Sequence, residues 1–379
     1  MIQLFSRRSS LDSREWQLKL RLVPWSIIGL LVLVAATGCL ALTSAGEGDF
    51  SIWAEKQVFR LALGACLMMC AAAIDIRHWY RLTYPIFIVG VLSLILVDII
   101  GYTGMGAQRW LDLGFMKIQP SELMKIALIM VLARYYHDLP PNAVKSLKSL
   151  LMPLLLIGVP VALVAIQPDL GTATKTMLAC IAMLFAAGVP MWLFIAGGGI
   201  FLALMPVLWA TMHDYQRDRV LTFLNPESDP FGAGYHITQS KIALGSGGFL
   251  GKGYLEGTQA RLDFLPEKHT DFIFTLWAEE MGWVGGVFLM VLYFLLIGVC
   301  MMQAMRTRHT FGRLLIFGIA FNLSLYVMIN IAMVMGLIPV VGVPLPFVSH
   351  GGTVTLSNMI GMGLILSVAI HRDSRLPSV

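Results

Sequence analysis

Ionisable residues of this chain gather where long apolar stretches begin, and their types suit proton transfer and anion binding. The segment FLPEKHTDFIF, residues 264–274, places Glu267, Lys268, His269 and Asp271 directly before an apolar run. A carboxylate at such a boundary either caps a helix or takes part in chemistry. As a cap, Asp271 would contribute on the order of 1 kcal/mol; as a working group, it could accept a proton from a hydroxyl. The residues alone leave both interpretations open.

A second group of polar residues lies in and before QPSELMKIALIM, residues 119–130. Glu122 and Lys125 are three residues apart, so they lie on one face of a predicted helix and can pair. A purely structural ion pair is the alternative to a role in substrate binding. Asp169, in QPDLGT, either caps the helix that follows it or belongs to the same site. The neighbouring polar candidates are Arg109, Trp110, Lys117 and Gln119.

Several familiar catalytic signatures are missing from the sequence. The run GSGGFLGKG has Ser246 where a phosphate-binding P-loop needs its first glycine, and Gly253 where it needs Ser or Thr. Neither HExxH nor GxSxG occurs. All five cysteines fall in apolar runs, which indicates neither a disulfide framework nor a metal site. The glycine-rich run therefore predicts a flexible turn, which could act as a hinge.

The elements that must hold these groups are membrane helices. Of the 379 residues, 57% are hydrophobic and only 13% are charged, against about 25% charged in soluble domains. That leaves too little polar surface to cover a soluble protein of this size. The net charge of +5 is better explained by orientation in a membrane than by binding to nucleic acid.

Apolar runs of about twenty residues predict an all-α bundle of about ten transmembrane helices. The runs lie near 24–44, 58–76, 82–101, 119–136, 149–167, 171–189, 191–211, 272–302, 312–336 and 347–370. Basic residues concentrate in alternate connecting segments, so the positive-inside rule predicts that both termini are cytoplasmic. The expected organisation is an N-terminal tail (1–23), a membrane domain (24–371) with a large periplasmic loop (212–270) between helices 7 and 8, and a C-terminal tail (372–379).

Several motifs, read in order, resemble the SEDS family of bacterial membrane proteins (shape, elongation, division and sporulation), and its elongation branch in particular. They are AQRWLDLG, QPSELMKIA, QPDLGT, MHDYQRDRV, NPESDPFGAGYHITQSKIALGSGG, LPEKHTDFIF and PVVGVPLPFVSHGGT. The resemblance covers nearly the whole chain after the first twenty or so residues. One departure is the SHGGT sequence, where the elongation members usually have SYGGS, so His350 and Thr353 change the local polar contacts.

The resemblance implies a peptidoglycan glycosyltransferase of the bacterial inner membrane. Such an enzyme polymerises lipid II, a disaccharide-pentapeptide on undecaprenyl pyrophosphate, and works with a class B penicillin-binding protein of the elongation machinery. It also implies that Asp271 is the general base of an inverting transfer and that a divalent cation (Mg²⁺ or Mn²⁺) can take part, although no ligand cluster is visible. A lipid II flippase and a non-catalytic scaffold are the alternatives; the absence of an internal repeat argues against the flippase. The expected substrate-binding residues are Arg109, Trp110, Lys117, Gln119, Glu122, Lys125, Lys268 and His269.

Overall fold

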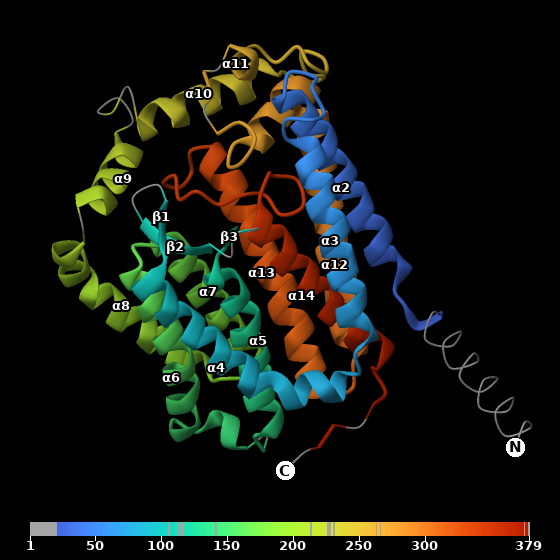
Figure 1. The fold of residues 1–379 in the computed structure, drawn as a ribbon. Helices are drawn as coiled ribbons and strands as arrows, with labels where there is room; N and C mark the ends of the chain where they lie inside the picture. Colours follow the sequence, from blue (N-terminus) through green and yellow to red (C-terminus); the bar gives the residue numbers. More distant parts are fainter. Residues whose placement is uncertain are drawn as a thin grey trace, which may run out of the picture.

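Helices make up most of the chain (Figure 1). The computed structural model describes residues 21–104, 107–112, 114, 117–140, 142–212, 214–225, 229, 232–262, 264–265, 267–374 and 376–377. The long helices are α2 (Trp25–Ala45), α3 (Ala54–Ala73), α4 (Ile76–Ile100), α5 (Pro120–Asp138), α6 (Lys148–Ile166), α7 (Leu170–Ala187), α8 (Met191–Thr211), α12 (Ile273–Arg306), α13 (Thr310–Val334) and α14 (Gly352–Ile370). In the described part of the chain, eight of these are long and apolar enough to cross a membrane. The predicted all-α membrane bundle is confirmed. For α5 and α8, crossing remains a prediction.

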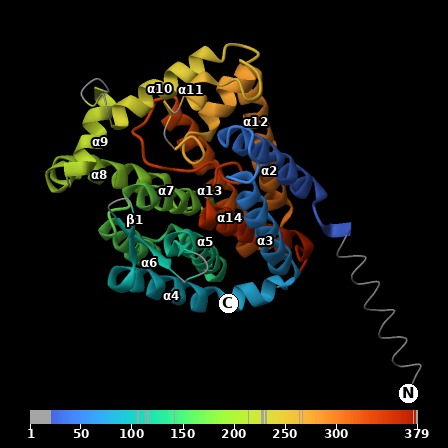
Figure 2. The same ribbon diagram turned by 45° about the horizontal axis from the view of Figure 1, so that its top comes forward.

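The centre of the bundle is formed by α13 and α14, with other helices around them (Figure 2). Helix α14 packs on α3, while α13 packs on α5, α7 and α12. Helix α5 is also buried along most of its length, although it is the least hydrophobic of the predicted crossings. Its surroundings are protein instead of lipid, so its hydropathy is low because it has little contact with the membrane. That position lets it carry charged side chains inside the bundle.

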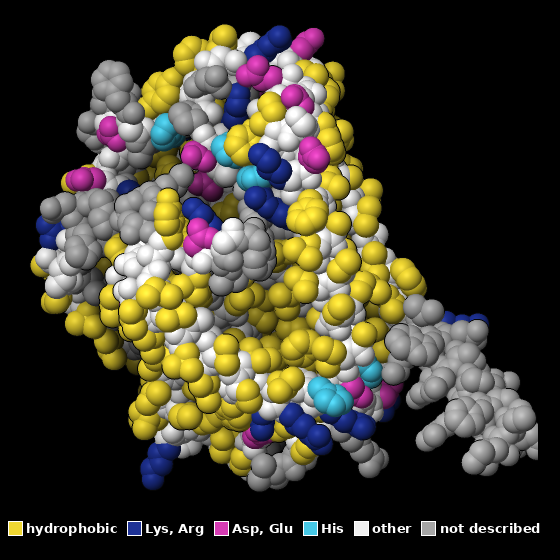
Figure 3. All heavy atoms as spheres, viewed as in Figure 1, with side chains coloured by type: hydrophobic (Ala, Val, Ile, Leu, Met, Phe, Trp, Pro, Cys, Tyr) yellow, Lys and Arg dark blue, Asp and Glu magenta, His cyan; other side chains and the backbone are white. Residues whose placement is uncertain are grey.

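The basic connecting segments meet at one end of the bundle, as the charge pattern predicts. Arg134, near the end of α5, donates to the carbonyl of Tyr80 (2.7 Å) and pairs with Asp138 (3.6 Å). Arg308, between α12 and α13, pairs with Asp373 after α14 (3.5 Å). Figure 3 shows Lys and Arg side chains at the lower rim, separated by a broad hydrophobic belt from a polar region above.

The opposite end carries the shorter elements. A small antiparallel sheet of β1 (Tyr102–Gly104), β2 (Ala107–Asp112) and β3 (Lys117–Ile118) connects α4 to α5. The segment predicted as one long loop, 212–270, contains α9 (Asp214–Leu224), α10 (Ala233–Ser246) and α11 (Thr258–Arg261). These three helices lie across the upper end of the bundle in Figure 1. The loop is therefore built largely from helix in its described residues.

The overlong apolar run that begins near Phe272 is one helix with a break. Gly282 in α12 has φ 66° and ψ −166°, a conformation that essentially only glycine adopts. Beyond the break, the amides of Trp283 and Val284 donate to the carbonyls of Gly248 (2.9 Å) and Phe249 (3.2 Å). The glycine-rich segment therefore closes the gap that the break leaves in the helix.

This segment, residues 248–253, is called the strap below, and it is held from both sides of the break. The amides of Lys252 and Gly253 donate to the carbonyls of Glu279 (3.1 Å) and Glu280 (3.0 Å), three and two residues before Gly282. A Cβ on Gly251 would lie 2.0 Å from the Glu280 carbonyl oxygen, so only glycine fits there. The expectation of a free hinge is therefore not supported, because the backbone of the strap is pinned to α12.

Candidate active site

A buried polar cluster lies in the middle of the bundle, between α5, α7 and α13. Glu122 and Lys125 form the predicted ion pair, with Lys125 Nζ 2.7 Å from Glu122 Oε1. Tyr326 of α13 donates to Glu122 Oε2 (2.5 Å), and its hydroxyl also accepts from Lys125. All three side chains are at most 3% exposed. The pairing is thus real, and it leaves Lys125 engaged instead of free for a substrate.

A fourth member of this cluster, Lys175 of α7, is not among the residues predicted from the sequence. It is 3% exposed, and its Nζ lies 4.3 Å from the centre of the Tyr326 ring, which Lys125 approaches to 4.5 Å. No described residue accepts a hydrogen bond from Lys175 or forms an ion pair with it. The signal was available in the sequence, since Lys175 is the sole charged residue within the apolar stretch 171–189.

Asp169 caps α7, as one of its two predicted roles requires, and it also contacts two of the predicted site residues. Its Oδ1 accepts from the Thr172 amide (3.1 Å), which makes it the N-cap of α7. Its Oδ2 accepts from Gln119 Nε2 (3.1 Å) and lies 3.8 Å from Arg109 Nε. Arg109 also donates to the carbonyl of Pro168 at 2.5 Å. The structure therefore joins the predicted residues Arg109 and Gln119 to the start of α7.

The other predicted residues of the sheet region are Lys117 and Trp110. Lys117 Nζ stands 3.8 Å from the centre of the Tyr102 ring, and Trp110 is the strand partner of Tyr102. Thr353 of α14 accepts from the Gln119 amide (3.2 Å) and donates to the Lys117 carbonyl (3.3 Å). The threonine in the SHGGT sequence thus ties the sheet to α14, so this departure from the family pattern is accommodated.

Asp271 lies just before α12, and its side chain caps no helix. The helix starts at Ile273 with Phe272 as N-cap residue and without a side-chain cap. Asn330 of α13 donates to the Asp271 carbonyl (2.8 Å) and to the Val343 carbonyl (2.7 Å), which fixes the backbone at this point. No donor within the described part of the chain hydrogen-bonds to the carboxylate. The capping interpretation is therefore wrong, and the carboxylate remains available for chemistry.

The surroundings of Asp271 make it a suitable base. Burial, reinforced by the negative charge of Glu267, raises its pKa from 3.8 to about 6, while Lys175 and Arg219 act in the opposite direction. An added Cβ on Gly342 would lie 3.3 Å from Asp271 Oδ2, so the loop between α13 and α14 closes over one side of the carboxylate. A carboxyl with a pKa near 6 is mostly ionised at neutral pH and accepts a proton more readily than an ordinary aspartate.

Lys268 and His269 approach α2 and α3 instead of the buried cluster. The His269 ring stacks on Trp53, with ring centres 3.8 Å apart, and Lys268 Nζ lies 3.8 Å from Glu47. His350 faces Arg60, with 2.8 Å between Nε2 and the guanidinium, and its amide donates to the His269 carbonyl (2.9 Å). Burial and the charge of Arg60 lower the pKa of His350 to about 4, so it is neutral and can accept from Arg60. His350 thereby helps to hold the backbone of His269 in place.

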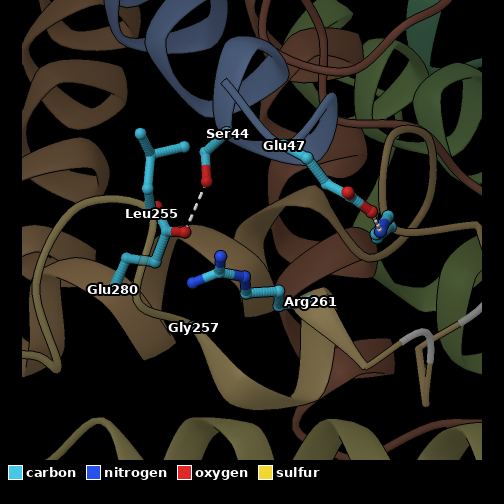
Figure 4. A pocket seen from close by; sticks show the side chains of 7 residues that line it. Ser44, Glu47, Leu255, Gly257, Arg261 and Glu280 are labelled. Atoms are coloured by element: carbon cyan, nitrogen blue, oxygen red, sulfur yellow. Dashed lines mark hydrogen bonds and ion pairs between the residues drawn. The ribbon is translucent and has the colours of Figure 1, made fainter. Parts of the chain in front are cut away.

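The two glutamates inside α12 hold neighbouring segments, Glu279 the strap and Glu280 the end of α2. Glu279 Oε1 accepts from Lys252 Nζ (2.6 Å) and from the Gln259 amide (3.0 Å). Glu280 accepts from Ser44 of α2, and both glutamates are almost fully buried. A pocket of about 180 Å³ lies beside this contact (Figure 4), lined by Ser44, Glu47, Leu255, Gly257, Arg261, Lys268 and Glu280. These carboxylates hold the break of α12 in place, which explains charge inside an apolar run.

The divalent cation implied by the resemblance has no ligand set that we can assign. Among the residues that the structure describes, no three His, Cys, Asp or Glu side chains are grouped so that they could hold a metal ion. Glu122 and Asp169 are already occupied by protein donors.

Comparisons with known proteins identify the family of the chain. Residues 16–374 match the FtsW/RodA/SpoVE family model, described as a cell cycle protein. The chain is 44% identical to the Escherichia coli peptidoglycan glycosyltransferase MrdB over 95% of its length and 97% of that protein's. It is 36% identical to a probable peptidoglycan glycosyltransferase, FtsW, of Coxiella burnetii, covering 92% of this chain and 95% of that one.

Solved structures give the same result. A chain from a peptidoglycan synthase complex that coordinates polymerisation and crosslinking superposes with TM-score 0.82 and 31% identity, over 92% of this chain and 98% of that one. The rod shape determining protein RodA of Thermus thermophilus superposes with TM-score 0.71 and 28% identity, over 93% and 98% of the two chains. The chain is therefore a multi-pass membrane protein that belongs to the FtsW/RodA/SpoVE family, the SEDS proteins.

Proposed function

We propose that this protein is a peptidoglycan glycosyltransferase that polymerises lipid II into glycan strands during cell elongation, with Asp271 as general base. The observation that carries the proposal is the state of Asp271. It is a carboxylate with a raised pKa and without a hydrogen-bond donor among the described residues, in a chain closely related to a named peptidoglycan glycosyltransferase. Buried carboxylates with a structural task are paired, as Glu122 and Asp169 are.

In the proposed reaction, a sugar hydroxyl of the acceptor attacks the anomeric carbon of the donor. The hydroxyl transfers its proton to Asp271, the new glycosidic bond forms, and the bond from the anomeric carbon to the lipid pyrophosphate breaks with its electron pair. A single displacement inverts the anomeric centre, so a second carboxylate is not needed as a nucleophile. General base catalysis of this kind contributes typically 10²–10⁴-fold to a rate.

The departing pyrophosphate needs positive charge nearby. Among the predicted cations, Lys125 is buried in its pair with Glu122, and Arg109 lies 3.8 Å from the buried Asp169. Lys117 is exposed on the sheet. Lys268 lies 3.8 Å from the exposed Glu47 and three residues before Asp271, and it lines the pocket of Figure 4. We assign pyrophosphate binding to Lys117 and Lys268, with His269 and Trp110 contacting the sugars. Gln119, Glu122, Lys125 and Arg109 then shape the floor of the site.

The proposed setting is the bacterial inner membrane, with both termini in the cytoplasm. It is supported by the basic rim, which gathers segments 77–81, 134–148, 306–313 and 372–373 at one end of the bundle, and by the positive-inside rule. Asp271 and the segment 212–270 then face the periplasm. The proposed partner is a class B penicillin-binding protein, since one relative belongs to a complex that couples polymerisation to crosslinking.

The test is polymerisation of fluorescent lipid II by purified protein in nanodiscs, with the partner present and its transpeptidase blocked by a β-lactam. Wild type is expected to produce a ladder of glycan strands on a denaturing gel. Asp271→Asn should lose activity by about 100-fold or more, because the amide cannot accept the proton. Asp49→Asn is the matched control, an exposed aspartate in the turn after α2.

The outcomes separate the alternative functions. A flippase would produce no glycan in a nanodisc, which has no second compartment, and a scaffold would produce none either. Full activity of Asp271→Asn in a protein that makes glycan would reject the base assignment while keeping the enzyme. Loss of activity in Asp49→Asn as well would show that the assay responds to any outer charge.

A further inference from the structure

The cations of the buried cluster and its neighbour Arg109 outnumber the carboxylates that could neutralise them by one. Glu122 is saturated by Lys125 and by the Tyr326 hydroxyl, and Asp169 by the Thr172 amide, Gln119 and Arg109. Lys175 is left without a hydrogen bond or ion pair from any described residue, although it is 3% exposed. A lone charge at such a depth is costly and marks a functional residue by default.

Contacts with helix α13 place Lys175 near Asp271. Tyr326, whose ring Lys175 approaches to 4.3 Å, and Asn330, whose amide holds the Asp271 carbonyl at 2.8 Å, are four residues apart. Residues at that spacing lie on one helix face, about 6 Å apart along the axis. Lys175 and Asp271 therefore contact neighbouring positions of the same face of α13.

Helix α7 leads to the same placement independently. Gly171 packs against the loop between α13 and α14, since an added Cβ would lie 3.2 Å from the Val341 carbonyl oxygen. The next residue of that loop, Gly342, borders the Asp271 carboxylate at 3.3 Å. Lys175 is four residues after Gly171 and thus lies on the α7 face that points toward this loop and α13.

We propose that Lys175 is a positioning residue, the buried counter-charge that keeps Asp271 ionised so that it can accept the proton of the acceptor hydroxyl. The proposal rests on the function proposed above. The two side chains are not in ion-pair contact, so Asp271 stays open to the substrate. A buried cation that lies nearby, but outside ion-pair distance, stabilises the charged carboxylate through the low-dielectric interior without occupying its oxygens.

No other group that acts on Asp271 provides a buried positive charge like that of Lys175. The charged groups that act on Asp271 come from its own loop, from α7 and from α9. Arg219 of α9 is exposed and therefore screened by salt, and Glu267 has the opposite effect. The neighbours from α13 and the following loop, Asn330 and Gly342, are neutral. Burial lowers the pKa of His236 on α10 and of His269, which favours the neutral form of both rings.

The test is the pH dependence of lipid II polymerisation for wild type, Lys175→Met, Lys175→Arg and Lys175→Gln. The wild-type acid limb should have its midpoint near pH 6, where Asp271 titrates. In Lys175→Met the midpoint should rise by about one unit, giving roughly threefold lower activity at pH 6.5 and recovery at pH 8.5. Lys175→Arg should retain the wild-type midpoint. Lys56→Met, which removes an exposed lysine of α3, is the control and should leave the midpoint unchanged.

Stability gives a second, independent result. Lys175→Met removes a buried cation that lies close to Lys125, so its apparent Tm should equal or exceed that of wild type while its activity at pH 6.5 falls. If Lys175 were merely structural, its replacement would lower the apparent Tm and the activity together. If Lys175→Met does not fold, Lys175→Gln provides the same pH comparison.

An unchanged midpoint in both neutral variants would overturn the proposal. An unchanged midpoint with a raised KM for lipid II would assign Lys175 to the pyrophosphate instead, and would also overturn it. These results differ from failure of the proposed function, in which wild type itself makes no glycan.

Discussion

Replacing Glu122 should damage this protein far more than replacing its partner Lys125. In wild type the buried cluster holds one negative and two positive charges, from Glu122, Lys125 and Lys175. Glu122→Gln leaves two buried cations that share one Tyr326 ring and have no anion between them. Lys125→Met leaves Glu122 with Lys175, which already lies against the same ring at 4.3 Å.

The expected sizes follow from this asymmetry. Breaking a buried pair and stranding its partner costs about 3–5 kcal/mol, so Glu122→Gln should lower the apparent Tm by on the order of 10 °C. Lys125→Met should cost only about 1–2 kcal/mol, because Lys175 can move toward the free carboxylate. The double variant leaves one cation, the same net charge as wild type, and should lie between the two. The order of damage is therefore Glu122→Gln, then the double variant, then Lys125→Met.

The assay is thermal unfolding of purified protein in detergent, followed by the loss of monodisperse protein on size-exclusion chromatography. Each variant is compared at pH 7.5 and at two salt concentrations, because a buried cluster should respond little to salt. Equal damage from Lys125→Met and Glu122→Gln would contradict the role given to Lys175 as a second partner. Simple addition of the two single effects would show that the residues are not coupled.

Two further predictions concern Asp271 and the break in α12. Because the pKa of Asp271 rises from 3.8 to about 6 on folding, its protonation stabilises the fold at low pH, and this contribution is lost as the pH rises through 6. Above pH 6, the free energy of unfolding of Asp271→Asn should therefore exceed that of wild type by up to about 3 kcal/mol, and its apparent Tm should be higher. The difference should vanish by pH 4. A difference that does not change with pH would contradict the raised pKa. Gly282→Ala should cost about 3 kcal/mol or more, since φ is 66° and its Cβ would lie 2.2 Å from the Gly251 amide nitrogen. Gly298→Ala, in the same helix with open space around it, should be neutral or stabilising in the same thermal assay.

Much of the fold could be predicted from hydropathy alone, because helices in lipid must satisfy their backbone internally and cover a fixed thickness. The Glu122–Lys125 pair could also be predicted, since helical spacing places both residues on one face. Asp169 could be predicted as a cap from its position before a helix. These features depend on residues close together in the chain.

The rest depends on contacts between distant segments, which composition does not encode. Tyr326 joins the buried cluster from a helix 201 residues after Lys125, and nothing near it in the sequence indicates this. Lys175 was overlooked because one lysine barely changes the hydropathy of an apolar helix. The strap was interpreted as a hinge because glycine permits both motion and close contact. The close approach of Gly251 to Gly282 shows that the glycines here serve close contact and not motion.

The position of Asp271 follows from what holds the outer part of α12, residues 273–281. At one end, Asn330 fixes the Asp271 carbonyl to α13, and at the other the strap fixes the break at Gly282. Between these points lie about two and a half turns of buried helix, a length that cannot bend without losing hydrogen bonds. A catalytic base must be held within about half an ångström of its productive place, and a short rigid segment anchored at both ends provides this. The carboxylate of Glu279 thus serves the base from a distance: it holds Lys252 of the strap, the strap holds the break, and the break sets where the helix that begins beside Asp271 must end.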